Sequence, residues 1–239
     1  MERGLCESRE KAKRAIMAGQ VQVNRQLARK PSDPVSDQDE LSLVAGEKYV
    51  SRGGHKLEAA LRSFNVDVSN QTAIDLGAST GGFTDCLLQH GAAKVYAVDV
   101  GQGQLAWKLR QDPRVAPMEK INARALTPAN FPQPFAPVDF ITIDCSFISL
   151  RKILLPAVAL LRPGGRIVAL IKPQFEAGKA EADRGAGVIR DPAVHERVLQ
   201  QLKGFVAAQA GLHWRAVVES PLLGPAGNRE FLVLIEKTR

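Results

Sequence analysis

The stretch Asp75-Leu76-Gly77-Ala78-Ser79-Thr80-Gly81-Gly82-Phe83 decides the fold of this chain. It lies between residues 72–76, whose apolar run predicts a strand that stops at Gly77, and residues 83–90, which predict a helix that stops before Gly91. Glycine lets the backbone turn tightly and lets a ligand approach closely, and the first N–H groups of the helix can meet an anionic group. The spacing is not G-x-G-x-x-G, which disfavours a dinucleotide site. A purely structural turn is the alternative.

Strand and helix patterns alternate from residue 70 onward, which predicts a parallel sheet covered by helices. Strands are predicted over residues 72–76, 94–100, 138–144, 166–171, 214–219 and 230–236. Only residues 220–229 separate the last two strands, which leaves no room for a helical crossover, so these strands must pair antiparallel. The predicted fold class is therefore α/β and Rossmann-like, with a mostly parallel sheet and a final antiparallel hairpin. Class I methyltransferases have this hairpin, and dehydrogenase-type sheets lack it.

Charged residues stand at the ends of three predicted strands. Asp99 ends the strand after the glycine turn, where a carboxylate can accept hydrogen bonds from both hydroxyls of an adenosine ribose. Asp144 and Lys172 end two neighbouring strands. Ligands of open α/β sheets bind outside the carboxyl ends of the strands, so we expect both side chains to face the crevice beside the glycine turn. The alternative for an isolated aspartate at such a position is a cap or a loop anchor.

Composition and charge limit the classes of partner. The 239 residues carry a formal net charge of +7, which suits a polyanion, either nucleic acid or an acidic membrane surface, unless the excess only solvates the surface. The cysteines are scattered, no His/Cys cluster has metal-ligand spacing, and the longest apolar run, Ile153–Leu161, is too short for a membrane span. No apolar signal segment opens the sequence. We therefore expect a soluble cytoplasmic protein with no metal and no membrane partner.

The amino-terminal segment differs in charge from the rest. Residues 8–30 carry seven basic residues against one acid. A helix is predicted from Arg9 to Ala18, followed by short strands at residues 21–23 and 41–44, and the segment ends near Glu47. The expected domains are therefore residues 1–47 and residues 48–239.

Several motifs resemble those of one known family. Residues 75–83, 144–150 and 172–176 are similar to the TlyA family of FtsJ-like ribose 2′-O-methyltransferases, which were historically labelled haemolysins. Residues 51–57 resemble that family's first catalytic motif, and residues 227–231 resemble its last. The resemblance implies a class I methyltransferase that uses S-adenosylmethionine and modifies ribosomal RNA, free or in assembled ribosomal subunits, with cytidine as the expected nucleotide.

The resemblance also extends to the amino-terminal segment. Residues 3–48 are similar to the RNA-binding αL motif first described in a ribosomal small-subunit protein. The family's first helix usually begins several residues earlier, so this small α+β domain is expected to be shortened at its start. The basic residues expected to contact RNA phosphates are Arg9, Lys11, Lys13, Arg14, Arg25, Arg29 and Lys30.

The family's catalytic tetrad implies a role for each of four residues. Carried over motif by motif, the tetrad is Lys56, Asp144, Lys172 and Glu230. Lys172 is expected to activate the ribose hydroxyl, Asp144 to hold Lys172, and the other two to complete the charge network. Cofactor contacts are expected along the glycine turn and at two later positions, namely Asp75, Gly77, Ala78, Ser79, Thr80, Gly81, Gly82, Phe83, Asp99 and Asn122.

The residues after Asp144 favour an oxygen acceptor. They are Cys145-Ser146-Phe147, where enzymes that methylate amino groups usually have Pro-Pro-Tyr or Pro-Pro-Phe. Three other functions stay open at this point: a membrane-acting haemolysin, a small-molecule methyltransferase, and an RNA-binding protein without catalysis. Residues 173–191 leave directly from Lys172 and are predicted to form a long loop that covers the acceptor ribose, with a mobile surface loop as the alternative.

Overall fold

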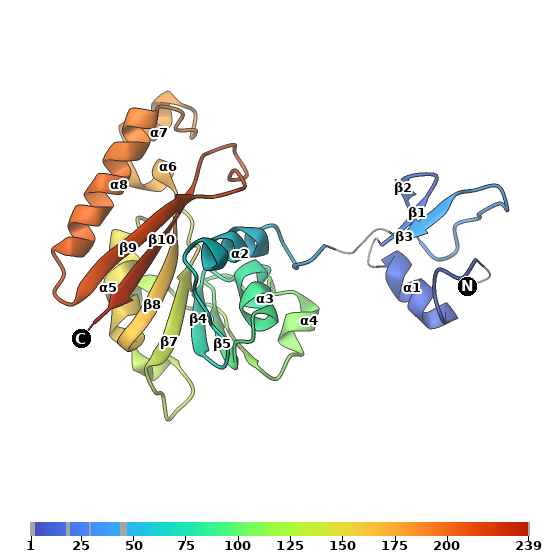
Figure 1. Cartoon of the computed structure of the whole chain (residues 1–239), viewed down its shortest axis with the longest axis horizontal. Coiled ribbons are helices and arrows are strands. Elements are labelled where there is room, and N and C mark those ends of the chain that lie inside the picture. Colours follow the sequence, from blue (N-terminus) through green and yellow to red (C-terminus); the bar gives the residue numbers. More distant parts are fainter. Residues whose placement is uncertain (1–2, 18–19, 29, 44–46, 239) are drawn as a thin grey trace. The chain divides into compact units, whose positions relative to one another are not determined.

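The computed structural model describes residues 3–17, 20–28, 30–43 and 47–238 (Figure 1). The chain divides into two compact units, Met1–Lys48 and Tyr49–Arg239. Within the described ranges, no helix is both long and apolar enough to cross a membrane.

The small unit contains one helix and one antiparallel sheet. Its elements are α1 (Arg9–Met17), β1 (Val21–Val23), β2 (Gln26–Leu27) and β3 (Leu41–Leu43), and the strand order is β2-β1-β3. Ser8 begins the helix as expected, because its Oγ accepts a hydrogen bond from the backbone N–H of Lys11 at 3.2 Å. Asn24 and Arg25 both have positive φ angles, 50° and 66°, and form the turn between β1 and β2. The sequence analysis predicted the helix and the outer two strands but not the two-residue strand β2.

The large unit is built on one seven-stranded sheet of order β6-β5-β4-β7-β8-β10-β9. Its strands are β4 (Thr72–Leu76), β5 (Lys94–Val98), β6 (Val115–Met118), β7 (Val138–Ile143), β8 (Leu161–Ile171), β9 (Leu212–Glu219) and β10 (Phe231–Lys237). The first five are parallel, and β10 pairs antiparallel with both β8 and β9. The predicted mostly parallel sheet with a final antiparallel hairpin is therefore confirmed. The prediction missed β6, a short edge strand that contains Pro117.

Helices cover the sheet, and each of its faces has its own apolar core. The helices and 3₁₀ turns are α2 (Gly53–Ser63), α3 (Gly82–Gln89), α4 (Trp107–Arg110), η1 (Ala123–Ala125), η2 (Pro128–Asn130), α5 (Arg151–Leu160), α6 (Pro173–Glu176), α7 (Lys179–Arg184) and α8 (Pro192–Ala207). Leu57 of α2 and Leu87 of α3 belong to one core, and Leu154 of α5 and Val198 of α8 belong to the other. Neighbouring side chains along each strand enter opposite cores, as the alternation of a strand requires.

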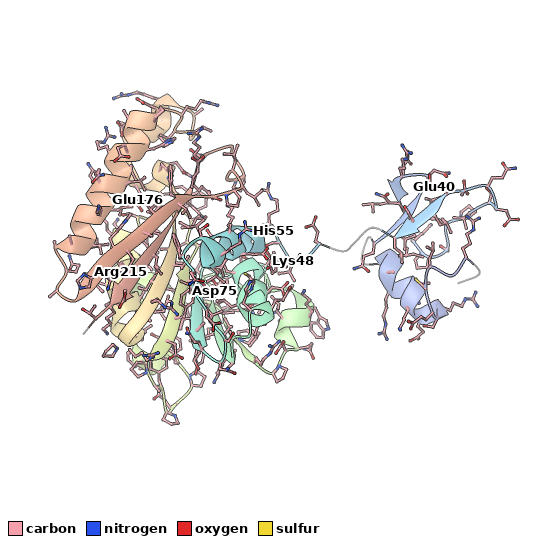
Figure 2. The ribbon with its side chains drawn as sticks, viewed as in Figure 1. Glu40, Lys48, His55, Asp75, Glu176 and Arg215 are labelled. Carbon is pink, nitrogen blue, oxygen red and sulfur yellow. The ribbon has the colours of Figure 1, made fainter. Side chains whose placement is uncertain are left out.

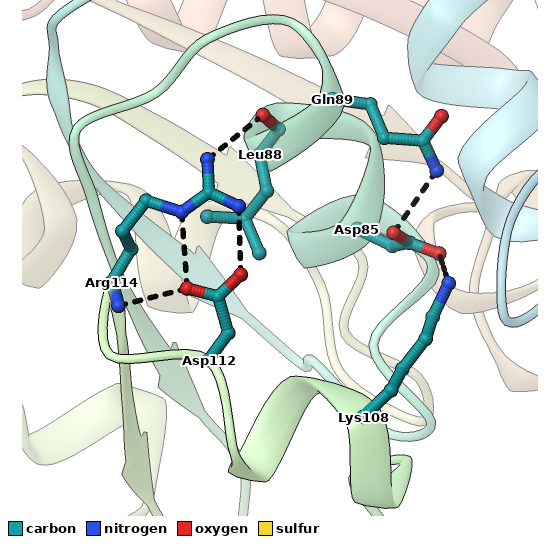
Figure 3. A network of polar contacts seen from close by, with 6 residues as sticks. All are labelled: Asp85, Leu88, Gln89, Lys108, Asp112 and Arg114. Carbon is teal, nitrogen blue, oxygen red and sulfur yellow. Dashed lines mark hydrogen bonds and ion pairs between the residues drawn. The ribbon is translucent and has the colours of Figure 1, made fainter.

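Polar contacts fix α3 to the segment that includes α4 and β6 (Figure 3). The carboxylate of Asp85 pairs with Lys108 of α4 at 2.9 Å and accepts a hydrogen bond from Gln89 at 3.1 Å. Arg114 donates a hydrogen bond to the carbonyl oxygen of Leu88 at 3.4 Å. These contacts hold the helix that follows the glycine turn against its neighbours.

The structure corrects the prediction for residues 173–191. This segment is not a long loop, because it contains the two short helices α6 and α7. Two of its backbone groups are held by the buried side chain of Asn228, whose oxygen accepts from Ile189 N and whose nitrogen donates to Gly187 O, both at 2.8 Å. The segment is thereby joined to the connection between β9 and β10.

Candidate active site

The glycine turn is shaped by close packing as well as by backbone conformation. Gly77 has a φ of 84°, and a Cβ atom there would lie 2.7 Å from the carbonyl oxygen of Asp144. A Cβ on Gly82 would lie 2.2 Å from Ser51 Oγ. Side chains at these positions would push apart β4, the end of β7 and the residues that lead into α2. The glycines therefore let three parts of the site meet.

A cavity of about 510 Å³ lies beside this turn, over the carboxyl ends of β4, β5 and β7. Its lining combines apolar side chains with a few polar ones: Gly77, Ser79, Val98, Asp99, Val100, Gln104, Ile121, Asn122, Ala123, Arg124, Asp144, Cys145, Ser146, Phe147, Ile148 and Ile153. Asp99 is held rigidly, since its two oxygens accept from Ser79 N at 2.8 Å and Gly101 N at 2.7 Å. The side-chain oxygen of Asn122 already accepts from Arg124 N at 3.0 Å, which leaves its amide nitrogen to meet a ligand.

Two of the residues expected at the cofactor lie behind the cavity wall. Gly81 packs against Leu109, whose Cδ1 would be 2.2 Å from an added Cβ, and it lines neither cavity of the site. Asp75 is fully buried inside the large unit (Figure 2) and accepts hydrogen bonds from Thr84 Oγ1 at 2.7 Å and Thr142 Oγ1 at 2.8 Å. Burial raises the pKa of Asp75 to about 6, against these two hydrogen bonds, which lower it. Its contacts fix the glycine turn from behind.

A second cavity, of about 290 Å³, adjoins the first. All four residues of the expected tetrad line it, together with most of the glycine turn: Ser51, Arg52, Gly53, Lys56, Gly77, Ala78, Ser79, Thr80, Gly82, Phe83, Asp144, Ser146, Lys172, Pro225 and Glu230. Gly77, Ser79, Asp144 and Ser146 line both cavities. The two spaces therefore meet at the end of β7.

The tetrad forms two ion pairs inside this second cavity. Lys56 Nζ lies 2.5 Å from Glu230 Oε2, and the side chains are 10% and 1% exposed. Lys172 Nζ lies 2.6 Å from Asp144 Oδ1, and it also donates a hydrogen bond to Ser146 Oγ at 2.8 Å. Both lysines are thus held by a carboxylate with little access to bulk water.

Sheet topology explains why residues so far apart in the sequence meet here. Asp144 follows β7 and Lys172 follows β8, and these parallel neighbours end at the same edge of the sheet. Glu230 directly precedes β10, which pairs antiparallel with β8 so that Phe231 stands opposite Ile171. The start of β10 therefore lies beside the end of β8.

Cys145 is the remaining nucleophile type beside the tetrad. Burial, with the nearby charge of Asp144, raises the pKa of the Cys145 thiol to about 12. The thiol stays protonated at neutral pH, so Cys145 is not suited to nucleophilic attack.

The sequence analysis did not single out several residues of the site. Ser146 binds Lys172, and Glu176 binds the segment that follows Asp144. Asn228 holds the segment between α6 and α8. All three stand in the motifs on which the family resemblance rests, but their partners are set by tertiary contacts that the sequence alone does not reveal.

The basic residues expected to contact RNA belong to the small unit. Lys11 forms an ion pair with Glu7, and Arg14 forms one with Glu10 at 3.5 Å, one helical turn away in each case. Arg9 and Lys13 line one surface hollow along α1. Arg9, Lys11, Lys13, Arg14, Arg25 and Lys30 are all exposed, and Arg29 lies outside the described residues.

The sheet order, the antiparallel β10 and the glycine turn define the large unit as a class I methyltransferase domain. Residues 49–237 match the family described as FtsJ-like methyltransferase, and residues 2–41 match the S4 domain. The 16S/23S rRNA (cytidine-2′-O)-methyltransferase TlyA of Mycobacterium tuberculosis is 45% identical over 233 residues, which cover 97% of this chain and 85% of that protein. The chain therefore belongs to the FtsJ-like methyltransferase family, in the group that includes TlyA, and carries an S4 domain.

Solved structures agree with this assignment. A candidate hemolysin from Streptococcus thermophilus shares 49% identity and a TM-score of 0.77, covering 99% of this chain and 86% of that one. The O-methyltransferase from Bacillus cereus in complex with SAH, at 17% identity, shares the fold with a TM-score of 0.54, covering 87% of this chain and 84% of that one.

Proposed function

We propose that this chain transfers a methyl group from S-adenosylmethionine to the ribose 2′-hydroxyl of a cytidine in ribosomal RNA, free or within a ribosomal subunit. The observation that carries the proposal is the meeting of Lys56, Asp144, Lys172 and Glu230 in one cavity beside the glycine turn. The TlyA relative from Mycobacterium tuberculosis is named for this reaction on 16S and 23S rRNA. Because ribosomal particles are the substrate, we infer a cytoplasmic location.

The residues of the larger cavity suit S-adenosylmethionine. Its volume of about 510 Å³ falls within the usual range for small-ligand sites, and its apolar side chains can enclose an adenine ring. Asp99 stands where a carboxylate can accept from a ribose diol, and the α3 N-terminus at Gly82 lines the neighbouring cavity, where a carboxylate would be favoured. When bound, S-adenosylmethionine supplies an electrophilic methyl group. Asp144, which lines both cavities, marks the place where donor and acceptor meet.

Lys172 and Asp144 act on the acceptor hydroxyl. A ribose hydroxyl is a weak nucleophile, so its oxygen must lose its proton as the bond to the methyl carbon forms. Lys172 Nζ accepts that proton in its neutral form. Asp144, 2.6 Å away, holds the amine toward the acceptor and stabilises the ammonium that results. Ser146 fixes the same amine from a second direction.

Lys56 and Glu230 shape the other side of the acceptor cavity. Their buried ion pair presents charge and hydrogen-bonding groups to a ribose entering between the two lysines. The pair is positioned before any substrate arrives, so little reorganisation is needed when the ribose binds.

The S4 domain supplies RNA affinity in this proposal. Its exposed cations can contact phosphates, and such contacts release counterions, so binding should weaken as the salt concentration rises.

Methyl transfer to purified ribosomal subunits tests the proposal. S-adenosylmethionine with an isotope-labelled methyl group is incubated with the chain and with subunits from a strain that lacks the corresponding gene. The proposal expects label in the RNA fraction and none in ribosomal proteins. Label confined to protein, or no label in either subunit, would contradict it. Dye leakage from liposomes, measured in parallel, tests the haemolysin alternative, and leakage without methyl transfer would favour that alternative.

A further inference from the structure

Two segments that follow neighbouring strands lie along one another at the site. Residues 144–150 follow β7 and residues 172–176 follow β8. At the near end, Lys172 contacts Asp144 and Ser146. In the middle, the rings of Phe147 and Phe175 lie with their centroids 5.1 Å apart. At the far end, the side chain of Glu176 bonds back to the first segment, so the two catalytic strand ends are linked at both ends of this contact.

Glu176 makes the far link with both carboxylate oxygens. Oε2 accepts from Ser149 Oγ at 2.7 Å, and Oε1 accepts from Leu150 N at 2.6 Å. These groups lie at the start of α5, which begins at Arg151, so the carboxylate caps a helix N-terminus whose free N–H groups attract negative charge. Hydrogen bonds to a charged acceptor are stronger than neutral ones and define a narrow geometry.

The surroundings leave Glu176 little freedom to move. It lines a residual cavity of only about 10 Å³, which Lys172, Cys145 and Leu150 also line. Packing this tight transmits a displacement of one wall to the others. Burial raises the pKa of Glu176, while its bonds to Leu150 and Ser149 and the charge of Arg151 lower it. Removing the carboxylate would leave the N–H of Leu150 without its acceptor.

We propose that Glu176 is a positioning residue for methyl transfer, which sets the spacing of Asp144 and Lys172 by fastening the segment after β8 to the start of α5. Glu176 lines neither of the two larger cavities of the site, so it acts through the two segments and not on the substrate. The inference rests on the proposed function, because it assigns a role in that same reaction. It adds a residue outside the tetrad on which the rate depends.

Single-turnover methyl transfer under saturating S-adenosylmethionine and ribosomal subunits tests this inference. We expect Glu176→Ala to lower the rate about tenfold or more, which corresponds to about 1.4 kcal/mol. The dissociation constant for S-adenosylmethionine and the KM for subunits should change less than about threefold, because the ligand-lining residues remain. Glu176→Gln should recover most of the rate, since its carbonyl can accept from Leu150 N while Ser149 turns to accept from the amide.

Two further variants keep the test decisive. Glu181→Gln is the matched control, because Glu181 belongs to α7 in the same segment and pairs with Arg197. It should keep the wild-type rate. Ser149→Ala removes one of the two bonds and should lower the rate by less than Glu176→Ala does, even if that variant folds poorly.

The rate is expressed per molecule that binds S-adenosylmethionine, so loss of folded protein does not count as loss of rate. A normal rate per binding molecule for both Glu176→Ala and Ser149→Ala would overturn the inference. So would a Glu176→Gln variant as slow as Glu176→Ala, because geometry would then not be what the carboxylate supplies. If the wild-type protein itself transfers no methyl group to RNA, the proposed function fails, and that result is distinct from either outcome above.

Discussion

Lys56 and Glu230 stand 174 positions apart in the sequence, yet Nζ of the lysine lies 2.5 Å from Oε2 of the glutamate. The pair joins α2 to the residue before β10 and closes one side of the acceptor cavity. Both side chains are nearly inaccessible to solvent, so each charge depends on the other for its stabilisation.

Breaking this pair from one side should destabilise the large unit. Glu230→Ala leaves a buried ammonium without a partner, and we expect the free energy of unfolding to fall by about 3–5 kcal/mol. The double variant Lys56→Met/Glu230→Leu removes both charges and should regain much of that loss while methyl transfer stays absent. Urea denaturation followed by circular dichroism measures the difference. Glu236→Ala breaks the exposed pair with Arg215 and should cost at most about 1 kcal/mol. Equal effects of Glu230→Ala and this control would contradict the prediction.

Cofactor affinity should depend on Asp99. Replacing Asp99 by alanine removes charge-assisted hydrogen bonds to a ribose diol, and we expect binding of S-adenosylmethionine to weaken by about 1–3 kcal/mol. Isothermal calorimetry with S-adenosylhomocysteine and S-adenosylmethionine gives the dissociation constants. Asp112→Ala serves as the control, because that carboxylate pairs with Arg114 and lines neither cavity. An unchanged affinity in Asp99→Ala would remove Asp99 from the binding site.

Asp75 should give the large unit a dependence of stability on pH. Burial raises the pKa of Asp75 from 3.8 to about 6, so the folded state favours the protonated carboxyl. The stability that protonation contributes is fully present below the unfolded pKa and is lost as the pH rises through about 6. An asparagine side chain does not titrate. Relative to wild type, Asp75→Asn should therefore gain up to about 3 kcal/mol of unfolding free energy between about pH 4 and pH 7.5. Urea titrations of both proteins at these pH values measure it, and a difference independent of pH would show that Asp75 keeps an ordinary pKa.

Salt dependence should separate the cations of the S4 domain from other surface charges. Arg9 and Lys13 line the same hollow on α1, so the double alanine variant should reduce the slope of log affinity against log salt by about 1 to 2. Lys203 is an exposed cation of α8, and Lys203→Ala should leave the slope unchanged. Filter binding to ribosomal subunits at several salt concentrations provides the slopes. If Lys203→Ala lowers the slope as much as the double variant, the contact surface is not the one proposed.

The sheet and the strand-end residues were predictable, and the details of their surroundings were not. The hairpin followed from the short connection at residues 220–229, and the meeting of Asp144 with Lys172 followed from parallel neighbouring strands. The helices within residues 173–191 were missed, because each is short and is supported by contacts with distant parts of the chain.

The glycine turn shows the same limit. Gly82 was expected to admit a ligand to the backbone, but its missing side chain also makes room for Ser51, which lies just before α2. The linking role of Glu176 depends on the contact between the ends of β7 and β8, and no local pattern announces such a contact.

Single-turnover methyl transfer, with the RNA digested to nucleosides and resolved by mass spectrometry, tests the central claim most directly. Wild-type protein, saturated with labelled S-adenosylmethionine, should place the label in 2′-O-methylcytidine. Lys172→Ala should bind the cofactor normally but lower the rate by about 10²–10⁴-fold, and Lys172→Arg should recover little, because a guanidinium does not accept a proton. Label on a base instead of a ribose, or a near wild-type rate for Lys172→Ala, would contradict the account.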